Sequence, residues 1–199
     1  MSVRQSLLAI LAQGSCYGYQ LRGEFARRTG DARTLNVGQV YNTLDRLERD
    51  GLVARGASDE RGHVFYEVTD AGRDEARTWF DTPLPPGGDD LPAKLALAST
   101  LPGIDARAVV RRQRAASAAA LRELRVRAAE RSATGSAAAG LAARIVVSAL
   151  LRRTQAELDW LDDVDAQLAG APTTGLEIEA RTPRRGRPPK NAAREALRG

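Results

Sequence analysis

The sequence predicts a mainly α-helical protein with one small β-hairpin, built as two units joined by a linker. Apolar residues in the first part recur at helical spacing in three short segments, and a stretch of alternating residues follows the third segment. A run rich in proline and glycine then precedes long segments rich in alanine and arginine. We expect a first unit over residues 1–81, a linker over 82–90, a helical second unit over 91–169 and a tail over 170–199.

The bulk composition excludes several classes of protein. Hydrophobic residues make up 43% and charged residues 28% of 199, which is typical of a globular chain. We see no leader pattern and no apolar run long enough to span a bilayer, so we expect a cytoplasmic protein without a membrane partner. One cysteine and one histidine cannot supply an ordinary metal site. Because the chain also has no phosphate-binding glycine loop, we expect neither a cofactor nor catalysis.

Two short amphipathic helices are predicted at the start of the first unit. Gly14 is expected to end the first helix and Gly30 the second. Cys16 then falls in the turn between them, beside the core. The apolar residues with helical spacing are Val3, Leu7, Ile10 and Leu11 in the first helix, and Tyr17, Leu21 and Phe25 in the second.

A third helix carries the most informative face of the first unit. Asn36 is a plausible N-cap and Gly51 a plausible C-terminal stop. The stripe that we expect to be buried contains Val40, Leu44 and Leu47 together with Val37. Opposite it lie Gln39, Asn42 and Arg46, with Thr43 and Arg49 at the edges. These side chains have the donors and acceptors that read base edges in a major groove, and Arg49 suits a phosphate equally well.

A β-hairpin is predicted after the third helix. Its strands are residues 52–55 and 63–68, joined by the loop 56–62, and a further helix follows from Thr69 or Asp70. Three helices followed by such a hairpin indicate a winged helix-turn-helix. Arg61 near the loop tip and the adjacent His63 are candidates for contacts with the DNA backbone. An exposed helix face and a hairpin tip are also commonly polar for solubility alone, so the structural alternative stays open for each residue.

The second unit is predicted to be wholly helical. We expect helices from about residue 91, from 105 to 131 and from 141 to 168. Apolar residues in the last helix alternate at spacings of four and three, interrupted at Thr154 and Asp165. This seam fits either packing within one chain or a dimer interface. Trp79 and Trp160 are candidates for an effector pocket, with ordinary core packing as the alternative.

The positive charge of the chain is concentrated in the tail. Residues 181–199 hold seven basic side chains and one acid, whereas the other 180 residues hold 23 basic and 24 acidic side chains. Within the tail, Arg185–Pro188 resembles the core of an AT-hook, a short extended motif that lies in the minor groove of AT-rich DNA. A basic tail without a defined binding mode is the alternative. The candidate minor-groove residues are Arg184, Arg185, Gly186, Arg187, Pro188 and Lys190.

The first unit resembles the PadR family of bacterial transcriptional regulators. The resemblance rests on Leu7–Leu11, Tyr17–Leu21, Val40–Val53 and Phe65–Gly72, and Leu91–Leu97 is similar to the helical C-terminal region of virulence-activator-like members. It implies a homodimer whose C-terminal helices exchange contacts on double-stranded DNA of two-fold character. It also implies repression that is often relieved by a small hydrophobic or phenolic effector.

The resemblance assigns one further contact and leaves the base preference open. Tyr41 corresponds to a recognition-helix tyrosine that touches the DNA backbone. The chain departs from the common pattern at Cys16, at Gln39 and at Asn42, where the family often has other residues. The function expected is therefore a sequence-specific regulator, most simply a dimeric repressor. The alternative is an architectural, nucleoid-associated protein that binds chiefly through its tail.

Overall fold

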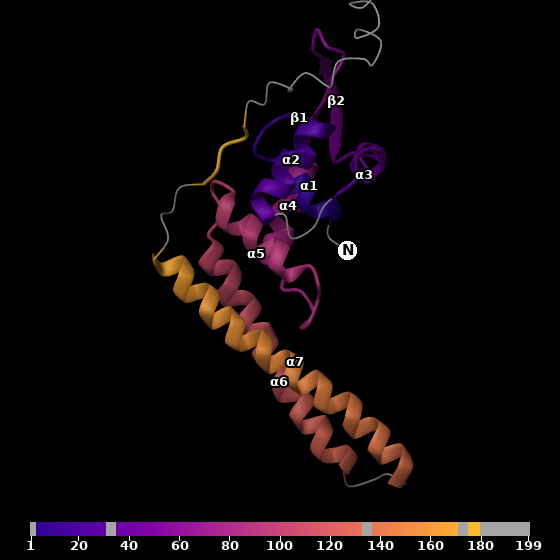
Figure 1. Ribbon diagram of the computed structural model, residues 1–199, viewed down its shortest axis with the longest axis vertical. Helices are drawn as coiled ribbons and strands as arrows, with labels where there is room; N and C mark the ends of the chain where they lie inside the picture. Colours follow the sequence, from indigo (N-terminus) through magenta and orange to yellow (C-terminus); the bar gives the residue numbers. More distant parts are fainter. Residues whose placement is uncertain (1–2, 31–34, 133–136, 171–174, 180–199) are drawn as a thin grey trace, which may run out of the picture.

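The computed structural model describes residues 3–30, 35–132, 137–170 and 175–179. Over these residues the chain forms a compact head and a long helical arm that projects from it (Figure 1). The head consists of α1 to α5 with a small sheet, and the arm is the pair α6 and α7. The elements are α1 (Val3–Leu11), β1 (Cys16–Tyr17), α2 (Gly18–Thr29), α3 (Val37–Arg49), β2 (Val53–Ser58), β3 (Val64–Val68), α4 (Asp70–Asp81), α5 (Leu91–Thr100), α6 (Ala106–Ser132) and α7 (Ala137–Gly170).

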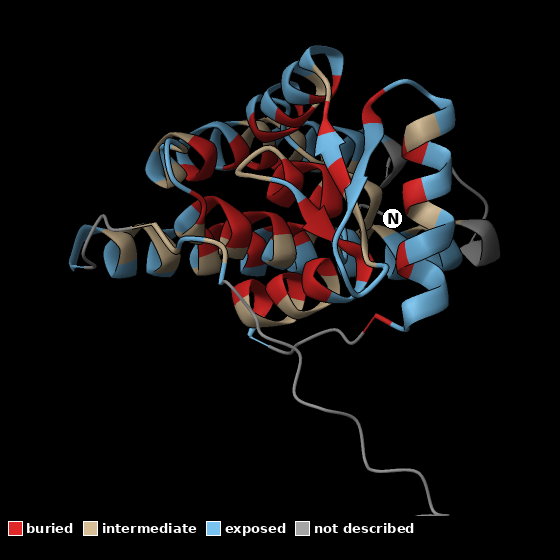
Figure 2. Cartoon of the chain, turned by 90° about the horizontal axis from the view of Figure 1, so that it is seen from above, coloured by how far each residue is buried: buried red, intermediate tan, exposed pale blue. Residues whose placement is uncertain are grey.

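The predicted apolar stripes form the core of the head except at Val37, which is 38% exposed because it is the first residue of α3, directly after the cap. Leu7, Leu21, Val40 and Leu44 are all fully buried, and buried residues gather between the helices and the sheet in Figure 2. Asn36 is the N-cap of α3, as predicted, because its side chain accepts a hydrogen bond from the backbone N–H three residues later. The mainly helical fold with a small β-wing is therefore confirmed.

The sheet has one strand more than the predicted hairpin. It is antiparallel with the order β1–β3–β2, and Cys16 of β1 lies opposite Tyr66 of β3. The prediction of a simple turn at Cys16 is thus wrong, because a strand of two residues is too short to show alternation in the sequence. Strand β2 also continues to Ser58 instead of ending at Arg55, with an irregular register between these two residues.

Helix α5 belongs to the core of the head although it follows the linker. Leu91 and Leu97 are buried in the same apolar cluster as the residues of α1 and α2. Lys94 is buried as well, with its ammonium donating to the Thr82 carbonyl at 2.6 Å and lying over the ring of Trp79. Helix α5 therefore packs in the same core as the elements that precede residues 82–90. The division of the chain into two units at these residues stays a prediction.

The arm is an antiparallel helical pair that carries both apolar and ionic contacts. Leu158 and Leu161 are buried, whereas Asp165 at the predicted seam receives two hydrogen bonds from Arg107 at 2.9 and 2.8 Å. The charged seam position therefore serves the contact between α6 and α7. Helix α7 begins at Ala137, four residues before the predicted start, and runs through the glycine at position 140.

Polar side chains of the arm hold the linker in place. The amide of Gln113 accepts from the Leu84 N–H at 2.8 Å and donates to the Leu84 carbonyl at 2.9 Å. Glu157, which is nearly buried, accepts from the N–H of Gly87 and from the hydroxyl of Ser117. Head and arm are thus joined by a linker whose backbone is hydrogen-bonded on the arm side. Within the described ranges, no helix combines the length and apolarity needed to cross a membrane.

Candidate DNA interface

The outward face of α3 presents the polar stripe expected from the sequence. Gln39, Asn42, Arg46 and Arg49 are exposed and Thr43 is half-buried, while Val40, Leu44 and Leu47 point into the core with no exposed surface. This arrangement follows from the helical period, because one face must supply the core of the head. We call these five polar residues the reading stripe. None of them is buried in the core of the head.

Two members of the reading stripe, Gln39 and Thr43, already make hydrogen bonds within the first turns of α3. Gln39 completes a capping box: its backbone N–H donates to the Asn36 side chain at 2.7 Å, and its amide oxygen accepts from the Asn36 N–H at 3.1 Å. The hydroxyl of Thr43 donates to the Gln39 carbonyl at 2.7 Å. A two-point contact from Gln39 to adenine would therefore have to break the capping box.

The other two central residues of the stripe keep all their polar groups available. Among the residues that the structure describes, the side chains of Asn42 and Arg46 make no hydrogen bond or ion pair. Exposed donors without protein partners lose little when they exchange water for a base edge. The structure thus favours Asn42 and Arg46 over Gln39 as the base-reading pair.

Tyr41 is positioned by a glycine at the start of α2. Its ring lies so close to Gly18 that a Cβ at that position would stand 2.7 Å from the ring. Only glycine permits this approach, which gives the Tyr17–Gly18–Tyr19 sequence a physical reason. Tyr41 as a residue is still 39% exposed, although its hydroxyl lies beside Gly18.

The two candidate residues of the wing differ in their surroundings. Arg61 lies exposed at the tip, and its guanidinium has no ion pair with any described residue. His63 instead stacks on the ring of Tyr17 at 4.5 Å between centroids, and its Nδ1 lies 2.9 Å from Asp59. The hydrogen bond with His63 lowers the pKa of Asp59. Arg61 is thus available to DNA, while His63 mainly fastens the wing to β1.

Arg55 is a functional candidate that the sequence reasoning missed. From β2 it donates to Glu48 at 2.8 Å and to Asp45 at 3.0 Å, and the hydrogen bond with Glu48 raises the pKa of Arg55. Both carboxylates belong to α3, on the flank of the reading stripe. Paired with Arg55, they repel a phosphate backbone less than free acids would. A signal was present in the sequence, since two acids spaced three apart on a DNA-facing helix need a neighbouring cation.

The two tryptophans lie in different places. Trp160 lines an open groove of about 720 Å³ between α5 and α7, together with Leu95, Ile104, Val164 and Leu168. Trp79 is 8% exposed and packs in the head against Phe80 and beneath Lys94. The two tryptophan rings therefore do not line one common pocket among the described residues. The candidate minor-groove residues 184–190 lie outside the described residues.

The arrangement of the head defines a class of protein. Three helices, a polar face on the third and a two-stranded wing beside it make a winged helix-turn-helix, whose third helix fits a major groove. Sequence comparison then shows which families the two parts of the chain resemble. Residues 7–78 match the transcriptional regulator PadR-like family, and residues 89–169 match the virulence activator alpha C-terminal family. The head of the chain is thus similar to PadR-like transcriptional regulators, and the region that follows it is similar to the virulence activator C-terminal region.

Solved structures show similar arrangements at low sequence identity. Bacillus subtilis PadR in complex with operator DNA is 20% identical, with 84% of this chain and 99% of that chain covered and a TM-score of 0.39. The same protein in complex with p-coumaric acid is 21% identical over 85% and 99%, with a TM-score of 0.38. The Vibrio cholerae virulence activator AphA is 24% identical over 83% and 97%, with a TM-score of 0.35. No curated protein sequence matches the chain.

Proposed function

We propose that this protein is a homodimeric, sequence-specific transcriptional regulator, most simply a repressor, that reads its operator with α3. The observation that carries the proposal is the reading stripe, in which Asn42 and Arg46 are exposed and unpaired within the described residues. Tyr41, Arg49 and Arg61 surround them as candidate backbone contacts. The basic tail adds affinity in the minor groove through residues 184–190.

Exposed apolar residues of the arm are the argument for proposing a homodimer. Large apolar side chains are exposed at its far end, where Ile145 is 61%, Val146 is 59% and Leu141 is 53% exposed. An apolar face of this kind on one chain is best covered by the same face of a second copy, because C2 pairing buries identical patches together. Two heads would then present two copies of α3, which suits an operator of two-fold character.

The groove beside Trp160 is the better candidate for an effector site. Most of its lining residues are apolar and come from α5, from α7 and from the loop that follows α5, and its size suits a small hydrophobic or phenolic molecule. Because α5 packs in the core of the head, a ligand there would touch both the head and the arm. The p-coumaric acid complex of Bacillus subtilis PadR suggests the first compounds to test.

Competition binding distinguishes the regulator from an architectural protein. The full chain is titrated onto labelled DNA from upstream of its own gene, with unlabelled upstream DNA or random AT-rich duplex as competitor. A specific regulator prefers its own site by at least about a thousandfold at physiological salt. Equal competition by both DNAs would instead support the architectural alternative. A chain ending at residue 179 shows how much of the affinity and of its salt dependence the tail supplies.

A further inference from the structure

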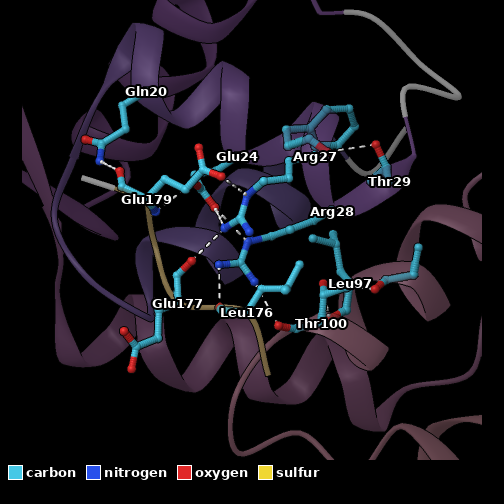
Figure 3. A network of polar contacts seen from close by, with 12 residues as sticks. Gln20, Glu24, Arg27, Arg28, Thr29, Leu97, Thr100, Leu176, Glu177 and Glu179 are labelled. Carbon is cyan, nitrogen blue, oxygen red and sulfur yellow. Dashed lines mark hydrogen bonds and ion pairs between the residues drawn. The ribbon is translucent and has the colours of Figure 1, made fainter. Parts of the chain in front are cut away.

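A short segment after the arm returns to the head and packs along α2. Residues 175–179 follow α7 and lie beside the helix that begins the helix-turn-helix (Figures 1 and 3). We call these five residues the strap. They run in the opposite direction to α2, since Leu176 contacts Arg28 near the C-terminal end of α2 and Glu179 contacts Gln20 near its N-terminal end.

One end of the strap completes the coordination of a buried arginine. Arg28 is 2% exposed and forms an ion pair with Glu24 at 3.1 Å. Its two terminal nitrogens donate to the carbonyls of Thr100 at 2.8 Å and Leu176 at 2.7 Å. The N–H of Leu176 in turn donates to the Thr100 carbonyl at 2.8 Å. A buried guanidinium is tolerated only when its N–H groups find acceptors, so the strap supplies a required partner.

The other end is held by side chains on the same face of α2 (Figure 3). The N–H of Glu179 donates to Glu24 at 3.0 Å, and its carbonyl accepts from Gln20 at 2.9 Å. Arg27 donates to the Glu177 carbonyl at 2.6 Å. Ile178 packs against the core of the head and contacts Gly14. Backbone groups along the strap are thus bound by α2, and the segment is fixed at both ends.

The strap shortens the stretch of chain between the head and the AT-hook-like core. The AT-hook-like core begins at Arg185, six residues after Glu179 but fifteen after Gly170, the last residue of α7. A chain spans at most about 3.5 Å per residue, so the reach is roughly 20 Å from the strap and roughly 50 Å from the arm. Glu179 lies at the first turn of α2, the end where Gly18 meets Tyr41 of α3.

From this geometry we propose that the strap is an anchor, which keeps the basic tail beside its own head so that both bind the same half-site. The proposal rests on the DNA-binding role proposed above for the tail. Effective concentration falls with about the three-halves power of tether length, so a tether of fifteen residues instead of six lowers it roughly fourfold. Glu24, Arg27 and Arg28 are then positioning residues for the tail.

The first test needs no DNA. Hydrogen exchange of the full-length protein is followed at the amides of Leu176 and Glu179, both of which donate to acceptors in the head. Protection well above that of an unstructured chain is expected at both positions. The matched variant replaces residues 175–179 by a glycine–serine segment of equal length and should lose this protection. Exchange of both wild-type amides at the rate of an unstructured chain would overturn the anchor, whatever the tail does on DNA.

The second test locates the tail on the operator. An iron chelate that cleaves DNA is attached to the variant Ala180→Cys, and burial of Cys16, which raises its pKa to about 12, keeps that thiol from being labelled at neutral pH. Cuts are expected within about 20 Å of the half-site, and the glycine–serine strap should spread them and weaken binding roughly fourfold. An unchanged cutting pattern would overturn the anchor. Protected amides together with DNA affinity unchanged by removal of residues 180–199 would instead refute the tail's proposed function.

Discussion

Helices α2 and α3 both carry arginines, but they use them in opposite ways. Arg22, Arg27 and Arg28 of α2 each donate to a backbone carbonyl: those of Leu35, Glu177 and Leu176, respectively. Arg46 of α3 has no such partner among the described residues. Arginine content alone therefore does not identify a DNA-binding face. An arginine that is to contact DNA must also have hydrogen-bonding groups that the fold has left unused, as Arg46 has among the described residues.

The largest effect should come from removing the most completely paired arginine. Arg28→Ala removes one of the two arginines paired with Glu24, which keeps Arg27 at 2.7 Å, and leaves the carbonyls of Thr100 and Leu176 without this donor. We expect a loss of about 3 kcal/mol in the free energy of unfolding, because each buried acceptor that loses its donor costs about 1–3 kcal/mol. Urea denaturation measures it, with Arg46→Ala as the matched control expected to change stability by less than about 0.5 kcal/mol. Equal losses of stability in both variants would contradict the view that the arginines of α2 stabilise the fold while Arg46 of α3 does not.

Arg46, whose removal should hardly change stability, is expected to matter for operator binding. Arg46→Ala should weaken operator binding by about 1–3 kcal/mol and relax the preference at one base position, because a two-point contact from arginine to guanine is lost. Arg122→Ala removes the same charge from an exposed position on α6 and serves as the control. Fluorescence anisotropy on the operator and on single-base variants gives both quantities. If the two substitutions weaken binding equally on every sequence, Arg46 contributes charge alone.

Much of the head could be predicted because its signals are local. The apolar stripe of α3, the cap at Asn36 and the breaks at Gly30 and Gly51 depend only on residues a few positions apart. The same period places Arg46 on the outer face. The fold class and the position of the reading stripe therefore follow from short-range pattern alone.

The parts that escaped prediction depend on contacts between distant positions. The two-residue strand β1 exists only because β3, almost fifty residues later, pairs with it. Arg55 reaches carboxylates on another element, and Arg28 is completed by a carbonyl 148 residues away. No periodicity in one sequence records such pairs, because the third dimension brings them together. The strap is therefore visible only once the chain has folded.

Lys94 is a buried cation with fewer hydrogen-bond partners than Arg28. Its ammonium is 1% exposed and donates to one carbonyl, and burial lowers its pKa from 10.5 to about 8. Below pH 8 the folded protein bears the full cost of the charge. As pH rises from about 8 to about 10.5, the folded state loses this proton before the unfolded state, so stability increases over that range.

Lys94→Met should therefore stabilise the protein at pH 7, by about 1–2 kcal/mol, because methionine fills the space without a charge to desolvate. The gain should shrink at pH 10, where the folded wild-type side chain is mostly neutral. Urea denaturation of both proteins at the two pH values provides the measurement, and groups other than Lys94 cancel in the difference. A gain that is the same at both pH values would show that packing, and not charge burial, sets the cost of Lys94.

Arg55 is the intermediate case, exposed yet fully paired, and the smallest effect is expected there. Arg55→Ala leaves Asp45 and Glu48 uncompensated beside the reading stripe and should weaken operator binding modestly, with a smaller effect at high salt. Stability should change little, since exposed ion pairs contribute little to folding. Adding Asp45→Asn and Glu48→Gln to Arg55→Ala removes the repulsion and should restore most of the lost affinity. Without that restoration, Arg55 would have to act on DNA directly instead of by neutralising α3.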